Sequence, residues 1–149
     1  MLLVQSTRAW LACGARIRYG KGLLMKGYSV LVVERDLAVG WMLTDLLELD
    51  GYQVVVARTG RAAIQQVHTS PPQVVLLDDH LSDMTMVECV SMLRALHPHL
   101  PIVRMTTNNQ SDRLGPRVDM LRTLRKPFDT AALLSLLEGA TSISVSIPG

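Results

Sequence analysis

The sequence predicts an α/β protein, a doubly wound (βα)5 sandwich in which helices cover both faces of a five-stranded parallel sheet. Short apolar runs alternate along the chain with longer segments whose apolar residues recur at helical spacing. The apolar runs lack period-two alternation, which is typical of parallel strands that are buried on both faces. A chain of 149 residues with 48% hydrophobic and 19% charged residues is sufficient for one such domain.

The first two expected strands are each followed by a helix. A strand at 29–33 leads to a helix of about 37–50, and Gly51 is placed to end that helix. A second strand at 52–57 precedes a short helix of roughly 60–69. These segments form the first two β–α units of the predicted sheet.

The third β–α unit follows a helix-breaking Pro71-Pro72 pair. Its strand is expected at 73–77 and its helix from about 85 to 97. Thr85 and Glu88 have the spacing of a capping box, in which each residue satisfies a backbone or side-chain group of the other at the start of a helix.

The remaining elements are expected in the order strand 101–105, helix 107–120, strand 121–124 and helix 130–138. The pattern for the first of these helices is polar and is interrupted at Gly115-Pro116. Asp129 is placed to cap the last helix and Gly139 to end it. We therefore expect the domain to span 29–139, with a frayed C-terminal tail at 140–149.

The N-terminal extension, residues 1–28, differs from the rest of the chain in its charge. It holds five bases and no acid. These bases are Arg8, Arg16, Arg18, Lys21 and Lys26. No basic stretch precedes its apolar residues, so a signal peptide is a poor match. A flexible tail, a short docking helix and sequence upstream of the true start remain open, and we assign the segment no function.

Charge and cysteine content exclude several classes of protein. The chain has 15 bases in all, so outside the extension 10 bases face 13 acids, a charge of −3. This body gives no electrostatic case for nucleic-acid binding, and no apolar run approaches the roughly 20 residues that span a bilayer. Cys13 and Cys89 form neither a disulfide framework nor a metal-binding spacing, which favours reduced thiols and a cytoplasmic protein.

Polar residues follow the expected strands at the point where each strand ends. The first strand ends in Glu34-Arg35-Asp36, the third in Asp78, the fourth in Thr106, and Lys126 follows the fifth. The carboxyl ends of parallel strands share one edge of a sheet, and open α/β sheets bind ligands at that edge. We therefore expect these side chains to form one pocket.

Residues 29–138, about three quarters of the chain, resemble the receiver domain of two-component response regulators. The matching motifs are Val32-Val33-Glu34-Arg35-Asp36, Leu76-Leu77-Asp78, Thr106 and Lys126-Pro127-Phe128. With this resemblance the expected strand order is 2-1-3-4-5, the flavodoxin-like arrangement.

The resemblance implies roles for the residues of the pocket. Asp78 corresponds to the acid that a histidine kinase phosphorylates, and Glu34, Asp78 and the backbone carbonyl of His80 correspond to ligands of Mg²⁺. Thr106 and Lys126 correspond to the hydroxyl and the ammonium that bind the phosphoryl oxygens. This combination suits phosphoryl transfer, which depends on positioning and on neutralising the charge of the phosphoryl group.

Several residues depart from the family pattern. Arg35 stands where a second acid usually binds the metal, and an arginine cannot coordinate Mg²⁺. One hypothesis is that Arg35 pairs with Asp78 or Glu34 and replaces the charge of the metal, which would make Mg²⁺ binding weak or absent. The alternative is that Arg35 points to solvent. Asp36 is better placed to cap the first helix than to bind metal.

Further departures lie in the fourth and fifth strands. Arg104 and Arg125 occupy strands that are ordinarily apolar, and Thr123 replaces the aromatic switch residue of the family. Asp79 and Asp83 are expected to be solvated loop acids.

The function predicted from these observations is that of a single-domain response regulator in a phosphorelay. Asp78 would receive a phosphoryl group from a sensor histidine kinase or a phosphotransfer protein, and the domain would signal by contact with a downstream protein. We expect no enzymatic activity, no nucleic-acid partner and no membrane association. The alternative is a pseudo-receiver, which would act as a protein-interaction module without being phosphorylated.

Overall fold

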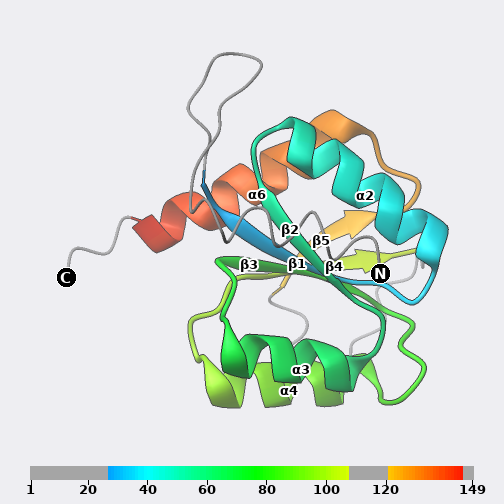
Figure 1. The fold of residues 1–149 in the computed structure, drawn as a ribbon, viewed down its shortest axis with the longest axis vertical. Coiled ribbons are helices and arrows are strands. Elements are labelled where there is room, and N and C mark those ends of the chain that lie inside the picture. Colours follow the sequence, from blue (N-terminus) through cyan, green and yellow to red (C-terminus); the bar gives the residue numbers. More distant parts are fainter. Residues whose placement is uncertain (1–26, 108–120, 146–149) are drawn as a thin grey trace.

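The strands form one parallel sheet, as the sequence predicts. The computed structural model describes residues 27–107 and 121–145, with 141–145 as backbone only (Figure 1). The strand order is β2-β1-β3-β4-β5, which confirms the predicted doubly wound topology. The strands are β1 (Ser29–Val33), β2 (Gln53–Ala57), β3 (Val74–Asp78), β4 (Ile102–Thr106) and β5 (Arg122–Arg125).

Helices cover both faces of this sheet. Those in the described part of the chain are α2 (Leu37–Leu49), α3 (Gly60–Thr69), α4 (Met86–Leu96) and α6 (Thr130–Val145). Figure 1 shows α2 and α6 on one face and α3 and α4 on the other. None of the helices among the described residues combines the length and the apolar character that a membrane crossing requires. The predictions for residues 1–26 and 108–120 lie outside the described residues.

The helix ends follow the predicted capping chemistry. The carboxylate of Asp36 accepts hydrogen bonds from the backbone N–H groups of Ala38 and Val39, so Asp36 is the N-cap of α2. Thr85 and Glu88 form the complete capping box of α4. Gly51 has a φ of 95° directly after α2, a conformation that glycine adopts without a steric penalty.

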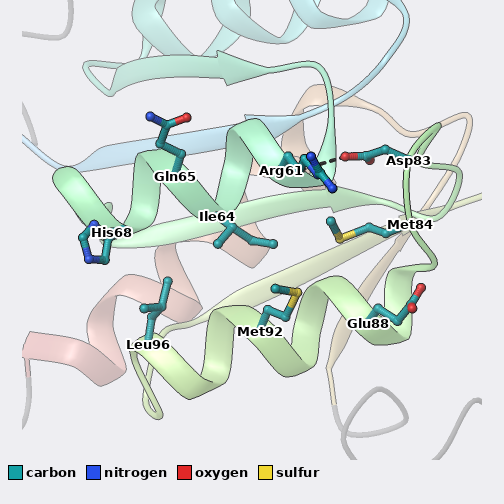
Figure 2. A pocket seen from close by; sticks show the side chains of 9 residues that line it. All are labelled: Arg61, Ile64, Gln65, His68, Asp83, Met84, Glu88, Met92 and Leu96. Carbon is teal, nitrogen blue, oxygen red and sulfur yellow. Dashed lines mark hydrogen bonds between the residues drawn. The ribbon is translucent and has the colours of Figure 1, made fainter.

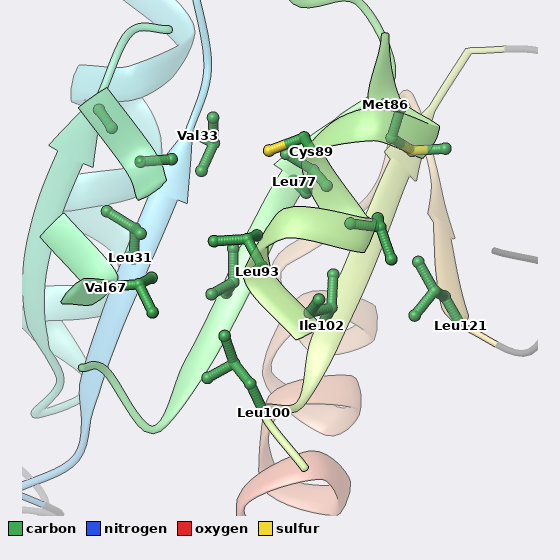
Figure 3. Packing of buried hydrophobic residues seen from close by; sticks show 14 residues of the cluster. Leu31, Val33, Val67, Leu77, Met86, Cys89, Leu93, Leu100, Ile102 and Leu121 are labelled. Carbon is green, nitrogen blue, oxygen red and sulfur yellow. The ribbon is translucent and has the colours of Figure 1, made fainter. Parts of the chain in front are cut away.

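Two apolar clusters fill the space between the sheet and its helices. One lies on the face covered by α3 and α4, where Cys89 and Leu93 of α4 pack against strand residues such as Leu77 and Ile102 (Figure 3). The other lies on the opposite face and includes Leu43 of α2. Because β1 and β3 are buried on both faces, every residue of β3 is buried, including Asp78 at its end.

The predicted end of the last helix is wrong. α6 continues through Gly139 to Val145 instead of ending at Gly139, so part of the expected tail at 140–149 is helical. The guanidinium of Arg122 lies where a side chain at position 139 would project, and Ala140 is buried in the core. A glycine inside a helix costs only about 1 kcal/mol relative to alanine, so this packing outweighs it.

Candidate functional site

Three charged side chains meet at the carboxyl edge of the sheet. The Lys126 ammonium lies 2.7 Å from Oδ1 of Asp78 and 2.9 Å from Oε2 of Glu34. Glu34 is 3% exposed and Asp78 is 5% exposed. A single lysine therefore bridges two buried carboxylates.

The register of the sheet brings these residues together. Glu34 directly follows β1 and Asp78 ends β3, and these two strands are neighbours, with Val33 paired to Leu77. Lys126 directly follows β5, and its backbone N–H donates to the carbonyl of Thr106 at 2.7 Å. The peptide bond between Lys126 and Pro127 is cis.

Backbone groups complete the contacts of the two carboxylates. Oε1 of Glu34 accepts a hydrogen bond from the N–H of Asp36 at 3.1 Å. Oδ2 of Asp78 accepts one from the N–H of His80 at 3.0 Å. Each of the four carboxylate oxygens thus has a donor, and the orientation of both side chains is fixed from the loops that follow β1 and β3.

Charge balance at the site is negative. Burial alone would lower the pKa of Lys126, but its hydrogen bonds to Asp78 and Glu34 and the charges of those acids raise the pKa above the usual value of 10.5. The ammonium therefore stays protonated. Among the described residues, one cation thus contacts two buried carboxylates, which leaves one negative charge of this group without a described counter-charge.

Thr106 and His80 lie at the same edge of the sheet. The register pairs Asp78 with Met105, so Thr106 ends β4 one residue further along, and it is 3% exposed. His80 is exposed, and its contact with the site is the backbone N–H bond to Asp78.

Arg35 does not make the contact that the substitution hypothesis requires. Its side chain is exposed, and the cation that contacts both Glu34 and Asp78 among the described residues is Lys126. The chain turns immediately after Glu34, because Asp36 begins α2 as its N-cap. The solvent-facing alternative therefore agrees with the structure.

The sequence predicts that Asp79 is a solvated loop acid, and this prediction is wrong. Asp79 forms a two-point pair with Arg104, with Nε–Oδ1 at 2.8 Å and Nη2–Oδ2 at 3.1 Å. Both side chains are nearly buried, at 12% and 11% exposed. An arginine in an otherwise apolar strand is the sequence signal that could have indicated a buried acidic partner.

Asp83 has a structural contact as well. Its two carboxylate oxygens accept hydrogen bonds from the backbone N–H groups of Gly60 at 2.8 Å and Arg61 at 3.0 Å, at the start of α3. The bonds from Arg61 and Gly60 lower the pKa of Asp83. The loop after β3 is thereby attached to the N-terminus of a different helix.

A shallow pocket of about 430 Å³ lies elsewhere, between α3 and α4. Figure 2 shows Ile64, Met92 and Leu96 on facing sides of it, with Arg61 and Asp83 at one end. None of the residues predicted for the functional site lines this pocket.

The acidic site suits a hard divalent cation. Within residues 27–107 and 121–145, no group of three or more His, Cys, Asp or Glu side chains converges. The two carboxylates of Glu34 and Asp78 are oxygen donors, and Mg²⁺ commonly binds one or two carboxylates while it keeps several waters. The uncompensated negative charge beside Lys126 favours such a cation.

The fold and the site together define a doubly wound α/β protein with a lysine-bridged acidic pocket at the carboxyl edge of its sheet. The family model described as "Response regulator receiver domain" matches residues 30–138. The chain therefore belongs to the response regulator receiver domain family, and the relatives that it matches are response regulators of two-component phosphorelays.

Individual relatives agree with this assignment. The transcriptional regulatory protein ZraR of Escherichia coli (strain K12) is 32% identical over 124 residues, which cover 80% of this chain and 27% of that protein. The response regulator protein FleR of Pseudomonas aeruginosa is 32% identical over 111 residues, covering 73% of this chain and 24% of FleR. The chain thus spans about a quarter of the length of these relatives.

Solved structures support the fold. The chemotaxis protein CheY4 of Vibrio cholerae has a TM-score of 0.69 and 26% identity, with coverage of 76% of this chain and 98% of CheY4. The receiver domain of the sensor histidine kinase PA1611 from Pseudomonas aeruginosa has a TM-score of 0.71 and 24% identity, covering 77% of this chain and 98% of that one. That structure has a magnesium ion coordinated in its active-site cleft. Receiver domains are in general signalling modules that interact with histidine kinases or phosphotransfer proteins.

Proposed function

We propose that Asp78 is the phosphoacceptor of this receiver domain. The observation that carries the proposal is the buried carboxylate pair of Asp78 and Glu34, bridged by Lys126 at 2.7 and 2.9 Å. A carboxylate that is desolvated but already paired with an ammonium can accept a phosphoryl group, because part of the added negative charge is offset in advance.

In the proposed step, a carboxylate oxygen of Asp78 attacks the phosphorus of a phosphohistidine. An O–P bond forms, the N–P bond of the donor breaks, and the released imidazole nitrogen keeps the electron pair of that bond and takes up a proton from solvent. Lys126 stays protonated throughout and balances charge on the transferred oxygens. The Thr106 hydroxyl is proposed to donate a hydrogen bond to the phosphoryl group.

Glu34, Asp78 and the carbonyl of His80 are the proposed ligands of Mg²⁺. When bound, the cation supplies charge neutralisation for the phosphoryl oxygens. Two carboxylates and one carbonyl form an oxygen-only donor set of the kind that Mg²⁺ prefers. Because Arg35 is exposed, it need not compete for these ligands. Of the two interpretations of Arg35 that the sequence leaves open, we propose the one with ordinary Mg²⁺ binding.

A sensor histidine kinase or a phosphotransfer protein is the proposed phosphoryl donor. α2 begins three residues after Glu34, and its exposed apolar residues Leu37 and Trp41 offer a protein-binding surface beside the pocket. We propose a cytoplasmic signalling module without enzymatic activity, whose output is contact with a downstream protein, with neither nucleic acid nor membrane as a partner. The single-domain organisation stays a prediction.

Incubation with acetyl phosphate and Mg²⁺, followed by intact mass spectrometry, tests the phosphoacceptor. We expect the mass of one phosphoryl group to be added to the wild-type chain and not to the Asp78→Asn variant. Asp45→Asn is the matched control, because Asp45 is an exposed acid on α2. No mass gain in the wild type, under conditions that phosphorylate another receiver domain, would favour the pseudo-receiver.

A further inference from the structure

Asp78 and Asp79 are consecutive, yet each is paired with a different cation. Asp78 contacts Lys126 at 2.7 Å. Asp79 contacts Arg104 through both of its oxygens, at 2.8 and 3.1 Å. Two adjacent carboxylates therefore have separate partners.

These two pairs lie on opposite faces of the sheet. Ile102 belongs to the apolar cluster under α3 and α4, whereas Val103 and Met105 belong to the cluster on the α2 and α6 face. Side chains alternate along a strand, so Arg104 shares the face of Ile102. Asp79 is drawn to that face by its contact with Arg104, away from the face on which Lys126 bridges Glu34 and Asp78.

We propose that Arg104 is a positioning residue for phosphoryl transfer to Asp78, because it holds Asp79 on the opposite face of the sheet and neutralises its charge. This inference rests on the proposed function of Asp78. Asp79 is bonded directly to the phosphoacceptor residue through the backbone, and its N–H donates to the carbonyl of Met105 at 3.0 Å. Both the backbone and the carboxylate of Asp79 are therefore held by residues of β4.

The pair of Arg104 and Asp79 affects phosphoryl transfer through the negative charge of Asp79. The pocket already has two carboxylates and one ammonium before an anionic phosphoryl donor arrives. An unpaired Asp79 would leave an uncompensated carboxylate on the residue next to the phosphoacceptor, and its negative charge would repel the anionic donor. Because Arg104 and Asp79 are nearly buried, water screens this effect only in part.

The test compares Arg104→Met, Asp79→Asn and the double variant, using the initial rate of phosphorylation by acetyl phosphate at saturating Mg²⁺ for the folded fraction. Arg104→Met is expected to react roughly tenfold more slowly than the wild type, since the Asp79 charge is then unpaired. Asp79→Asn and the double variant are expected to react within about twofold of the wild type, because that charge is absent. A role in packing alone would leave the double variant at least as slow as Arg104→Met.

Two further variants separate the effect of the Arg104 charge from the effect of its shape. They also replace Arg104→Met in the test if that variant does not fold. Arg104→Lys keeps the charge and should react within about threefold of the wild type, whereas Arg104→Gln should be as slow as Arg104→Met. The proposal is overturned if Arg104→Met or Arg104→Gln reacts at the wild-type rate, or if Asp79→Asn fails to restore the rate in the double variant.

A second readout keeps this inference distinct from the proposed function. Mg²⁺ affinity measured by calorimetry should be roughly threefold higher in Arg104→Met than in the wild type, because an unpaired carboxylate attracts the cation. In the double variant the Mg²⁺ affinity should return to that of the wild type. If no variant is phosphorylated but these affinities are found, the phosphoacceptor proposal fails and the charge inference stands. If the wild type is phosphorylated and Arg104→Met binds Mg²⁺ no more tightly, the charge inference fails alone.

Discussion

Replacing Lys126 by methionine would leave Glu34 and Asp78 without the ammonium that joins them. Methionine has a similar length and no charge, so the change removes the two contacts of 2.7 and 2.9 Å with little loss of volume. The two acids are 5% exposed or less, so water cannot readily replace the lost partner. We expect the folded state to be strongly destabilised.

The size of the effect follows from the burial of the pair. Removing one partner of a buried ion pair costs about 3–5 kcal/mol, because it leaves an uncompensated charge. In this site one lysine serves two acids, which favours the upper part of that range. The remaining backbone donors, the N–H groups of Asp36 and His80, stay in place and prevent a larger loss.

Urea denaturation followed by circular dichroism at pH 7 measures this change in the free energy of unfolding. Arg35→Met is the matched control, since Arg35 is also a cation next to Glu34 but is exposed. We expect that control to change the free energy of unfolding by no more than about 0.5 kcal/mol. Millimolar Mg²⁺ should restore part of the stability of Lys126→Met, because the cation binds only to the folded pocket.

A loss below about 1 kcal/mol in Lys126→Met, which is the range of an exposed ion pair, would show that Lys126 does not stabilise the two buried acids. A larger loss in Arg35→Met than in Lys126→Met would show the same. In that case Arg35, and not Lys126, would balance the charge of the two acids.

Three further outcomes are expected. The pKa of Lys126 is raised in the folded state, so its stabilising contribution is complete below the ordinary value of 10.5 and is lost as pH rises through the folded value. The difference in free energy of unfolding between wild type and Lys126→Met should therefore shrink only above about pH 10.5. Urea titrations across alkaline pH measure this difference. Burial raises the pKa of the Cys89 thiol to about 12, so iodoacetamide at pH 8 should modify Cys89 in the native protein far more slowly than in urea, and equal rates by peptide mass spectrometry would contradict its burial. Asp83→Ala should lower the melting temperature more than the exposed control Asp45→Asn, because it removes both acceptors for the first N–H groups of α3; equal melting temperatures would contradict that role.

Most of the fold could be predicted from the sequence because its local signals agree with one another. The buried apolar runs became β1, β3 and β4, and the expected capping residues became the N-caps of α2 and α4. The end of α6 was missed because Gly139 is a local stop signal, whereas in the fold the Arg122 guanidinium occupies the space of a side chain at position 139. Periodicity along one segment contains no information about such a contact.

The site was predictable to the extent that strand ends share one edge. This rule identified Glu34, Asp78 and Lys126, which are in contact. The partners of Asp79 and Asp83 were missed, because each depends on how a loop crosses a neighbouring strand or helix. The sequence left two orientations of Arg35 open, and the structure has the exposed one, where the chain turns as Asp36 caps α2.

Localising the phosphoryl group tests whether Asp78 is the phosphoacceptor. The chain would be treated with acetyl phosphate and Mg²⁺, the acyl phosphate reduced with borohydride, and the peptide containing residues 74–83 sequenced by mass spectrometry. We expect Asp78 alone to be converted to homoserine. Conversion at Asp79 or at any other acid, with Asp78 unmodified, would contradict it.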